Sequence, residues 1–187
     1  MRSIVPLILA LLVSPSSNPA AELSSSQGRV FSSVDLGFRF TPPPGLRDLT
    51  AALKERERRR TPDGRTHFAM LLWMASGPDD TAEDWVALGV ETYPRGRDKD
   101  RGDDLTASFT TNVSALPGST TERLVIKLSG QDFAVSRVER KEPLLTKYGV
   151  VYTTVRKEQF VTFLFGGNDR NRVEKLAGSM KTLEFAP

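Results

Sequence analysis

The chain of 187 residues contains no cysteine and only one histidine. Without cysteine it can form neither a disulfide nor a thiolate-ligated zinc or iron–sulfur site, and it has no thiol nucleophile. One imidazole cannot build a metal site from several histidines. These absences exclude a disulfide scaffold and cysteine catalysis. What remains is an ordinary globular composition, with 39% apolar and 26% charged residues.

The chain also lacks a strong excess of either charge. Its 26 basic and 23 acidic side chains leave a net charge of +3. Proteins that bind nucleic acids usually cluster Lys and Arg on one surface, but the one dense basic stretch here, Arg56 to Arg60, is interrupted by Glu57. A solvated helix face explains this stretch, and attachment to a polyanion or a membrane surface is the alternative hypothesis. We expect no nucleic-acid partner.

An uncharged, mostly apolar run at residues 4–13 follows Arg2 and precedes small residues up to Ala21. This order is typical of a secretory signal peptide, and the run is shorter than the roughly 20 apolar residues that cross a bilayer. We predict that residues 1–21 are a signal peptide, 22–28 a Ser-rich flexible tether and 29–187 a single domain. The mature chain is then exported to the periplasm or the cell exterior, without a transmembrane segment.

Hydrophobic periodicity predicts an α+β domain. Alternating or continuous apolar residues predict strands at 30–41, 67–75, 85–93, 122–128, 131–138, 148–156 and 159–165, although residues 81–84 could instead cap a helix over 85–93. Helical spacing predicts helices at 46–60, with Asp48 or Thr50 as cap, from 103 or 104 to 116, and after Asn168, with Gly166-Gly167 ending the preceding strand. Short connections favour a single, mostly antiparallel sheet of six or seven strands with helices packed on it.

Several of these segments resemble a known fold group. The residues that carry the resemblance are 37–45, 131–137, 148–156, 160–165 and 179–185. The likeness as a whole extends over about half of the mature chain. These segments are similar to small exported bacterial proteins of the PsbP/Mog1-like α/β/α group. The resemblance implies that fold and a binding or scaffolding role, as in a photosystem subunit and a nuclear-transport factor. It brings no catalytic motif, and no functional residue of the group matches a position here.

Four residues are candidates for a ligand groove: His67, Trp73, Trp85 and Tyr93. Aromatic rings and an imidazole can line a binding cleft, but the tryptophans can equally belong to the core and the histidine to a solvated strand end. Nothing in the sequence places an orienting carboxylate on His67, which a general base requires.

An acidic loop is the candidate for a metal site, through Asp98, Asp100, Asp103 and Asp104. Alternating carboxylates can supply the oxygen ligands of Ca²⁺. The spacing departs from an EF-hand, because Gly102 falls at the fifth position and no Glu closes the loop twelve residues on. A helix cap beside a solvated loop is the alternative interpretation.

The sequence contains no nucleophile elbow or phosphate-binding loop, so no reactive constellation can be assembled. We therefore predict an exported cell-envelope protein that acts as a non-enzymatic binding or interaction module without a cofactor. Its partner would be an unidentified envelope protein or a small ligand. The alternative is an exported hydrolase or metal-assisted enzyme that uses the acidic loops between Asp79 and Asp104.

Overall fold

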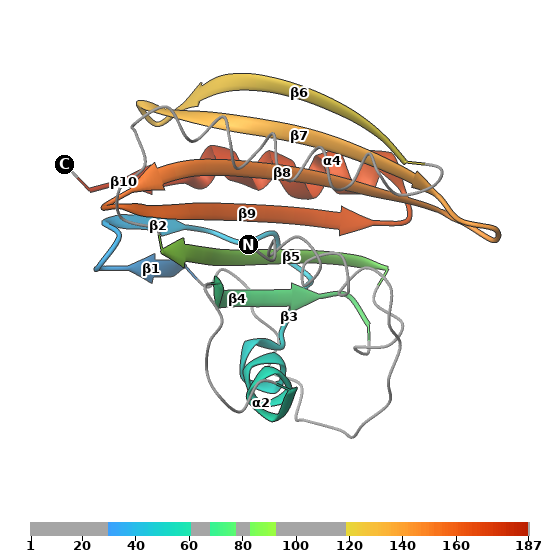
Figure 1. Cartoon of the computed structure of the whole chain (residues 1–187), viewed down its shortest axis with the longest axis horizontal. Helices are drawn as coiled ribbons and strands as arrows, with labels where there is room; N and C mark the ends of the chain where they lie inside the picture. The colour runs from blue at the N-terminus through green and yellow to red at the C-terminus, as the bar shows by residue number, and fades with distance from the viewer. Residues whose placement is uncertain (1–29, 61–67, 78–82, 93–118, 187) are drawn as a thin grey trace.

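The computed structural model describes residues 30–60, 68–77, 83–92 and 119–186 (Figure 1). Its main feature is a seven-stranded sheet in which every neighbouring pair is antiparallel, with the order β3-β4-β5-β9-β8-β7-β6. The strands are β3 (Arg47–Asp48), β4 (Phe68–Ala75), β5 (Asp84–Thr92), β6 (Ser119–Leu128), β7 (Gln131–Lys141), β8 (Thr146–Arg156) and β9 (Gln159–Gly167). The predicted fold class is confirmed.

A second, three-stranded sheet joins the two ends of the domain. It pairs β1 (Phe31–Ser33), β2 (Phe38–Phe40) and β10 (Glu184–Phe185), with β2 in the centre. The prediction of one continuous strand at 30–41 was wrong, because the chain reverses between β1 and β2. Gly37 has a φ of +65° in this turn and its N–H donates to the carbonyl of Val34. The alternation of apolar residues runs through the turn and conceals it.

Two long hairpins build one half of the large sheet, as predicted. Ser129 and Gly130 join β6 to β7, and both have positive φ, as a two-residue hairpin turn requires. Lys157 and Glu158 join β8 to β9 in the same way without a glycine. The segment 85–93 belongs to a strand, β5, and not to the alternative helix.

The helices begin later than the sequence suggested. Helix α2 (Thr50–Arg60) starts after β3, and its first N–H, that of Thr50, donates to Asp48 Oδ1 at 3.0 Å. The helix α4 (Arg170–Ala177) is capped by Asp169 and not by Asn168, because Asp169 Oδ1 accepts from the N–H of Arg172 at 2.8 Å. A 3-10 helix, η1 (Gly178–Thr182), continues α4. The predicted helix ending at 116 lies outside the described residues.

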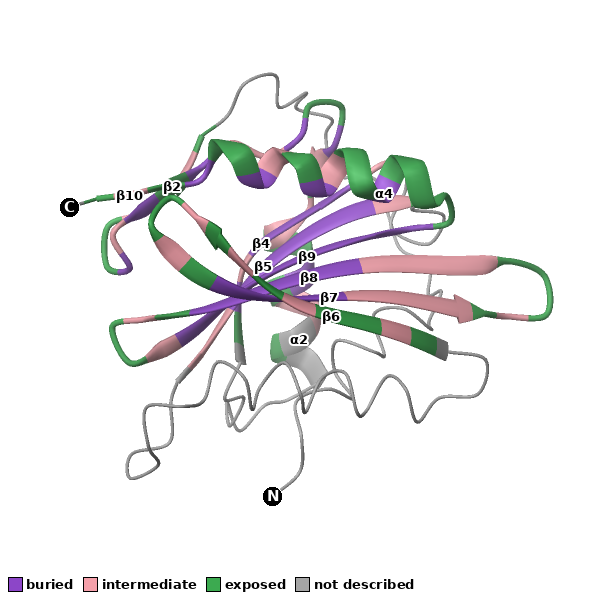
Figure 2. Ribbon diagram, turned by 90° about the horizontal axis from the view of Figure 1, so that it is seen from above, coloured by how far each residue is buried: buried purple, intermediate pink, exposed green. Residues whose placement is uncertain are grey.

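The large sheet is covered by described elements on both faces, which Figure 2 shows edge-on. We call the side of α4 and the small sheet the α4 face, and the side of α2 the α2 face. The α4 face carries the larger cluster, rich in phenylalanine, including Phe38, Phe40, Phe133, Phe163 and Phe165. The α2 face carries a separate cluster of Leu53, Met70, Trp73, Ala75, Trp85, Ala87, Val151 and Leu164.

Strand β9 runs through Gly166 and Gly167, so the prediction that this pair breaks the strand was wrong. Both glycines pair with β5 and with β8. A Cβ atom on Gly166 would lie 2.2 Å from Trp85 Cζ2, and one on Gly167 would lie 2.5 Å from Asp84 Oδ1. The glycines are therefore sites of close packing inside the sheet.

Candidate functional site

Charged side chains of α4, which packs on β8 and β9, reach across to the neighbouring strand β7. Two residues one helical turn apart, Arg170 and Glu174, face two residues that share one side of β7, Glu139 and Arg137. Four helical residues rise about 6 Å and two strand residues about 6.6 Å, so the two spacings nearly match. Arg137 faces Glu174 and Glu139 faces Arg170, so each side chain lies opposite one of the other charge.

Both resulting ion pairs are hydrogen-bonded. Arg137 Nε donates to Glu174 Oε1 at 2.8 Å, and Arg170 Nη2 donates to Glu139 Oε2. The Arg170 guanidinium also lies over the ring of Tyr148 on β8, with its Cζ 5.4 Å from the ring centroid. Such a cation–π contact restrains the guanidinium while leaving part of it accessible. The helix and the sheet are thus joined by groups that keep a defined orientation.

Beside these ion pairs lies a cavity of about 280 Å³. Its charged wall comes from β6, β7 and α4, with Glu122, Arg137, Glu139, Arg170 and Glu174 as the ionisable residues. Tyr148, Val150 and Val173 supply apolar surface beneath them. The size is at the lower end of the range of small-molecule sites. Three carboxylates and two guanidiniums give the lining one excess negative charge.

The electrostatics of the cavity act on one of its arginines, Arg137. The hydrogen bond from Arg137 to Glu174 raises the pKa of Arg137 above its usual value, so this guanidinium stays positive at any physiological pH. Burial raises the pKa of Tyr152, which lies next to Arg137, so its phenol stays neutral at neutral pH. The Arg137 guanidinium can therefore offer a positively charged hydrogen-bond donor to a polar ligand.

The described part of the chain brings together no catalytic set. It holds no histidine or cysteine, and within it no three metal-ligating side chains gather at one point. The cavity includes two hydroxyl-bearing residues, Thr120 and Thr121. Two of the three carboxylates that line it form ion pairs with arginines, and the third, Glu122, lies on the edge strand β6. A hydroxyl nucleophile needs a base within hydrogen-bond reach.

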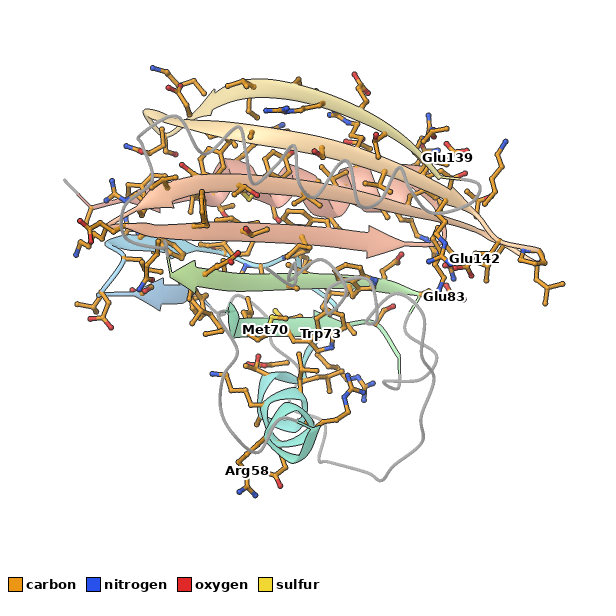
Figure 3. All side chains as sticks on the ribbon, viewed as in Figure 1. Arg58, Met70, Trp73, Glu83, Glu139 and Glu142 are labelled. Atoms are coloured by element: carbon orange, nitrogen blue, oxygen red, sulfur yellow. The ribbon has the colours of Figure 1, made fainter. Side chains whose placement is uncertain are left out.

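Two of the predicted ligand residues, Trp73 and Trp85, lie away from this cavity. Trp73 and Trp85 stack on the α2 face, with ring centroids 5.1 Å apart and an interplanar angle of 25°, and both are buried. Figure 3 shows Trp73 and Met70 on β4, on the side of α2. Their surroundings are the core cluster of that face, away from the charged cavity. His67 and Tyr93 lie outside the described residues.

The predicted metal ligands Asp98, Asp100, Asp103 and Asp104 also lie outside the described residues. Of the acidic stretch that begins at Asp79, the structure describes Glu83 and Asp84. Both contact Arg172 of α4, Glu83 at 3.1 Å and Asp84 at 3.5 Å. The contact between α4 and the start of β5 thus includes Arg172, Glu83 and the partly buried Asp84.

The cavity residues were missed because each looks ordinary in the sequence. The available signal was a pair of opposite charges at i and i+2 in β7 and a second pair at i and i+4 in the last helix, namely Arg137, Glu139, Arg170 and Glu174. Each pattern alone is typical of a solvated surface. The contact between them depends on where α4 crosses the sheet.

No family model and no curated protein matches the chain. Solved structures do. Cyanobacterial PsbP (CyanoP) from Synechocystis sp. PCC 6803 is similar over 91% of this chain and 98% of its own length, with a TM-score of 0.53 and 10% identity. LpqN of Mycobacterium tuberculosis, a protein involved in cell envelope biogenesis, covers 65% of this chain and 79% of its own, with a TM-score of 0.44 and 11% identity. The likeness to CyanoP shows that the chain has the PsbP-like α+β fold expected from its sequence.

Proposed function

We propose that the chain is an exported cell-envelope protein that works as a non-enzymatic binding module, and that it binds in the cavity between α4 and strands β6 to β8. The proposal of export is supported by the order of basic, apolar and small residues at 1–21. It is compatible with the helices of the described residues, none of which is long and apolar enough to cross a membrane.

The observation that carries the binding role is the charged cavity itself. Arg137 and Arg170 are already held in place, by Glu174 and Glu139, before any ligand arrives. A site whose side chains are ordered in advance loses less conformational entropy on binding. Glu122 adds a further carboxylate at the open side, on the edge strand.

These features support a small polar ligand that carries charges of both signs. Its acidic group would contact the guanidiniums and its basic group the carboxylates, while Tyr148 and Val150 would contact its carbon atoms. A molecule of amino-acid size matches a volume of about 280 Å³. Charged side chains of an envelope partner could use the same groups.

The test is a binding screen with the full chain, in which ligand-observed NMR compares small zwitterionic, cationic, anionic and neutral molecules. We expect zwitterions to bind and neutral molecules of equal size not to. The variant Arg137→Gln should weaken binding at least tenfold, because one guanidinium is lost and Glu174 is left without its partner.

The matched control is Arg39→Gln, which removes the arginine of an exposed ion pair with Glu184 on the small sheet, away from the cavity. This variant should bind as the unchanged protein does. The proposal is overturned if neutral molecules bind as well as zwitterions, if no class binds, or if the two variants weaken binding equally.

A further inference from the structure

The hairpin of β7 and β8 extends beyond the rest of the large sheet. On one side the last pair between β6 and β7 is Ser119 with Arg140, and on the other the last pair between β8 and β9 is Tyr148 with Gly167. Residues 141–147 therefore project past both neighbouring strands, as Figure 1 shows at the right-hand end of the sheet. We call residues 140–147 the arm.

The tip of the arm is apolar and open to solvent. Leu144 has 96% of its surface exposed and Leu145 has 39%, and Pro143 beside them is also exposed. The backbone of the tip is fixed, since the N–H of Glu142 donates to the carbonyl of Leu145 at 2.8 Å. An exposed leucine on a loop is common, but a fixed projection that carries two of them side by side is suited to insertion into an apolar phase.

Basic side chains surround the base of the arm. Arg140, Lys141 and Lys147 contribute three positive charges. The one carboxylate among them, Glu142, lies 3.5 Å from both Arg140 and Lys147, so its charge is compensated within the arm. The arm therefore carries a net charge of +2 behind its apolar tip.

From this geometry we propose that the arm attaches the protein to a membrane surface that contains anionic phospholipid. Leu144 and Leu145 enter the boundary between headgroups and acyl chains, and the exposed Lys141 contacts the lipid phosphates. Arg140 and Lys147, whose side chains are only 21% and 25% exposed, add to the positive potential behind the tip. Leu144 lies in the turn before β8 and Lys147 follows it by three residues, so the two are at most about 11 Å apart along the chain. Apolar groups of peripheral proteins reach about 5–10 Å into this boundary, so the basic residues would lie at the depth of the headgroups.

Charge favours a lipid surface over a protein partner. A protein groove that accepts two leucines needs no basic border, whereas an anionic bilayer attracts each nearby Lys or Arg. The turn between β1 and β2 offers a comparison within the same molecule. Val34 is 87% exposed there, but it is followed by Asp35 and has no lysine or arginine within four residues on either side. The one basic side chain bonded to the described turn, Arg156, donates to the carbonyl of Leu36, so with Asp35 the turn carries no net positive charge. This second tip should not enter an anionic membrane.

The experiment uses the absence of cysteine, because a single introduced cysteine can be labelled uniquely. The full chain carrying Leu144→Cys receives an environment-sensitive fluorophore and is mixed with vesicles of phosphatidylglycerol and phosphatidylcholine. We expect a blue shift of the emission that weakens as salt is added, because screening reduces attraction between exposed charges. Vesicles of phosphatidylcholine alone should give little or no shift.

The control is the full chain with Val34→Cys carrying the same fluorophore. It retains the apolar run at residues 4–13, so any membrane contact made by that run affects both labelled proteins alike. The labelled Val34 position should show no shift. In unlabelled protein, we compare the double variant Leu144→Ser, Leu145→Ser with the variant Val34→Ser. The amount of the double variant that sediments with anionic vesicles should be at least tenfold smaller than that of Val34→Ser.

Three outcomes overturn the proposal: no shift at Leu144→Cys, an equal shift at Val34→Cys, or a shift that salt and lipid charge do not alter. A shift without vesicles that grows with protein concentration shows instead that the tip contacts a second copy of the chain. Binding in the cavity is a separate matter, so Arg137→Gln should leave the fluorescence shift unchanged.

Discussion

The two faces of the large sheet are packed in different ways. On the α4 face, Phe163 of β9 contacts three other rings, those of Phe38, Phe40 and Phe133, at centroid distances of 5.7, 5.3 and 6.4 Å. On the α2 face, Trp85 lies against a glycine, Gly166, and stacks on Trp73. The α4 face is stabilised by several phenylalanine rings in mutual contact. The α2 face is stabilised by one stacked pair of indoles, one of which occupies the space that a side chain at Gly166 would fill.

The α4 face is itself divided into an apolar part and a charged part. The rings of the α4 face come from segments far apart in the sequence, so they hold the small sheet onto the large one. Beyond these rings α4 turns charged residues, Arg170 and Glu174, toward β7. The layer becomes polar there and leaves room for the cavity.

The largest effect should come from Phe163→Ala. Phe163 is fully buried, and removing a buried phenylalanine costs about 3–5 kcal/mol of stability through lost contacts and the cavity left behind. The neighbouring Leu164→Ala changes the opposite face and should cost about 2–3 kcal/mol. Urea denaturation of both variants measures the difference. An equal or larger loss for Leu164→Ala would contradict the greater weight given to the α4 face.

Gly166→Ala should be the next most damaging change and tests the α2 face. The new methyl group would lie 2.2 Å from Trp85 Cζ2, so the indole must move and its stacking on Trp73 is disturbed. We expect a loss of about 2–3 kcal/mol, as for an overpacked core, together with a changed near-ultraviolet circular dichroism spectrum.

Its matched control is Gly149→Ala. Gly149 pairs with Gly166 across the sheet, but a Cβ there would meet its nearest atoms at 3.7 and 3.9 Å, which is ordinary contact. This variant should lose less than about 1 kcal/mol. If both variants are equally unstable, the glycine is needed for the strand and not for the indole.

A smaller loss is expected from Asp169→Ala, which removes the cap of the helix on the α4 face. The carboxylate accepts the N–H of Arg172, and loss of such a cap costs about 1 kcal/mol. The adjacent Asn168→Ala should change stability by less than about 0.5 kcal/mol, since Asn168 is exposed and does not cap the helix. Thermal denaturation of both variants measures the difference. A larger loss for Asn168→Ala than for Asp169→Ala would show that Asn168 caps the helix.

The smallest effect, a gain, is expected from Asp84→Asn at the border of the α4 face. Burial raises the pKa of Asp84 above its ordinary value of 3.8, although Arg172 counteracts this, and its Oδ1 atom is buried without a hydrogen bond. Because the folded state has the higher pKa, the ionised group destabilises it at neutral pH. The variant should therefore be slightly more stable at pH 7.

The gain should disappear as the pH falls through the folded-state pKa of Asp84 toward 3.8, because the natural side chain then becomes neutral as well. Urea denaturation at several pH values measures this dependence. Glu83→Gln, which changes an exposed partner of the same Arg172, serves as control. A gain that persists below pH 3.8 would exclude ionisation of Asp84 as its cause.

Local patterns were sufficient to predict most strands and the fold class. The hairpin at Ser129-Gly130 was predicted because two alternating strands flank a turn dipeptide, and the structure pairs these strands residue by residue. The reversal at Gly37 and the cap at Asp169 were not predicted. In both, neighbouring residues offer equally acceptable local signals, and the partner strand or the packed helix selects one of them.

The cavity could not be predicted in this way. Arg137 and Glu174 are 37 residues apart, and neither lies in a motif. Their contact depends on how α4 lies over β8 and β9 beside β7. That position is set by the packing of Val173 and Ala177 of α4, and of Met180 in η1, onto the core. The positions of Trp73 and Trp85 could not be predicted either. A tryptophan can line a groove or belong to the core, and only the structure shows that these two stack in the core of the α2 face.

By itself, the sequence determined most of the strands, the antiparallel pairing within hairpins and the absence of thiol chemistry, because these follow from residue type and from interactions over a few positions. The tertiary structure alone decided which charged groups meet, which glycine receives an indole ring and which leucine is left exposed. Those outcomes depend on contacts between distant segments, whose geometry arises only when the layers pack.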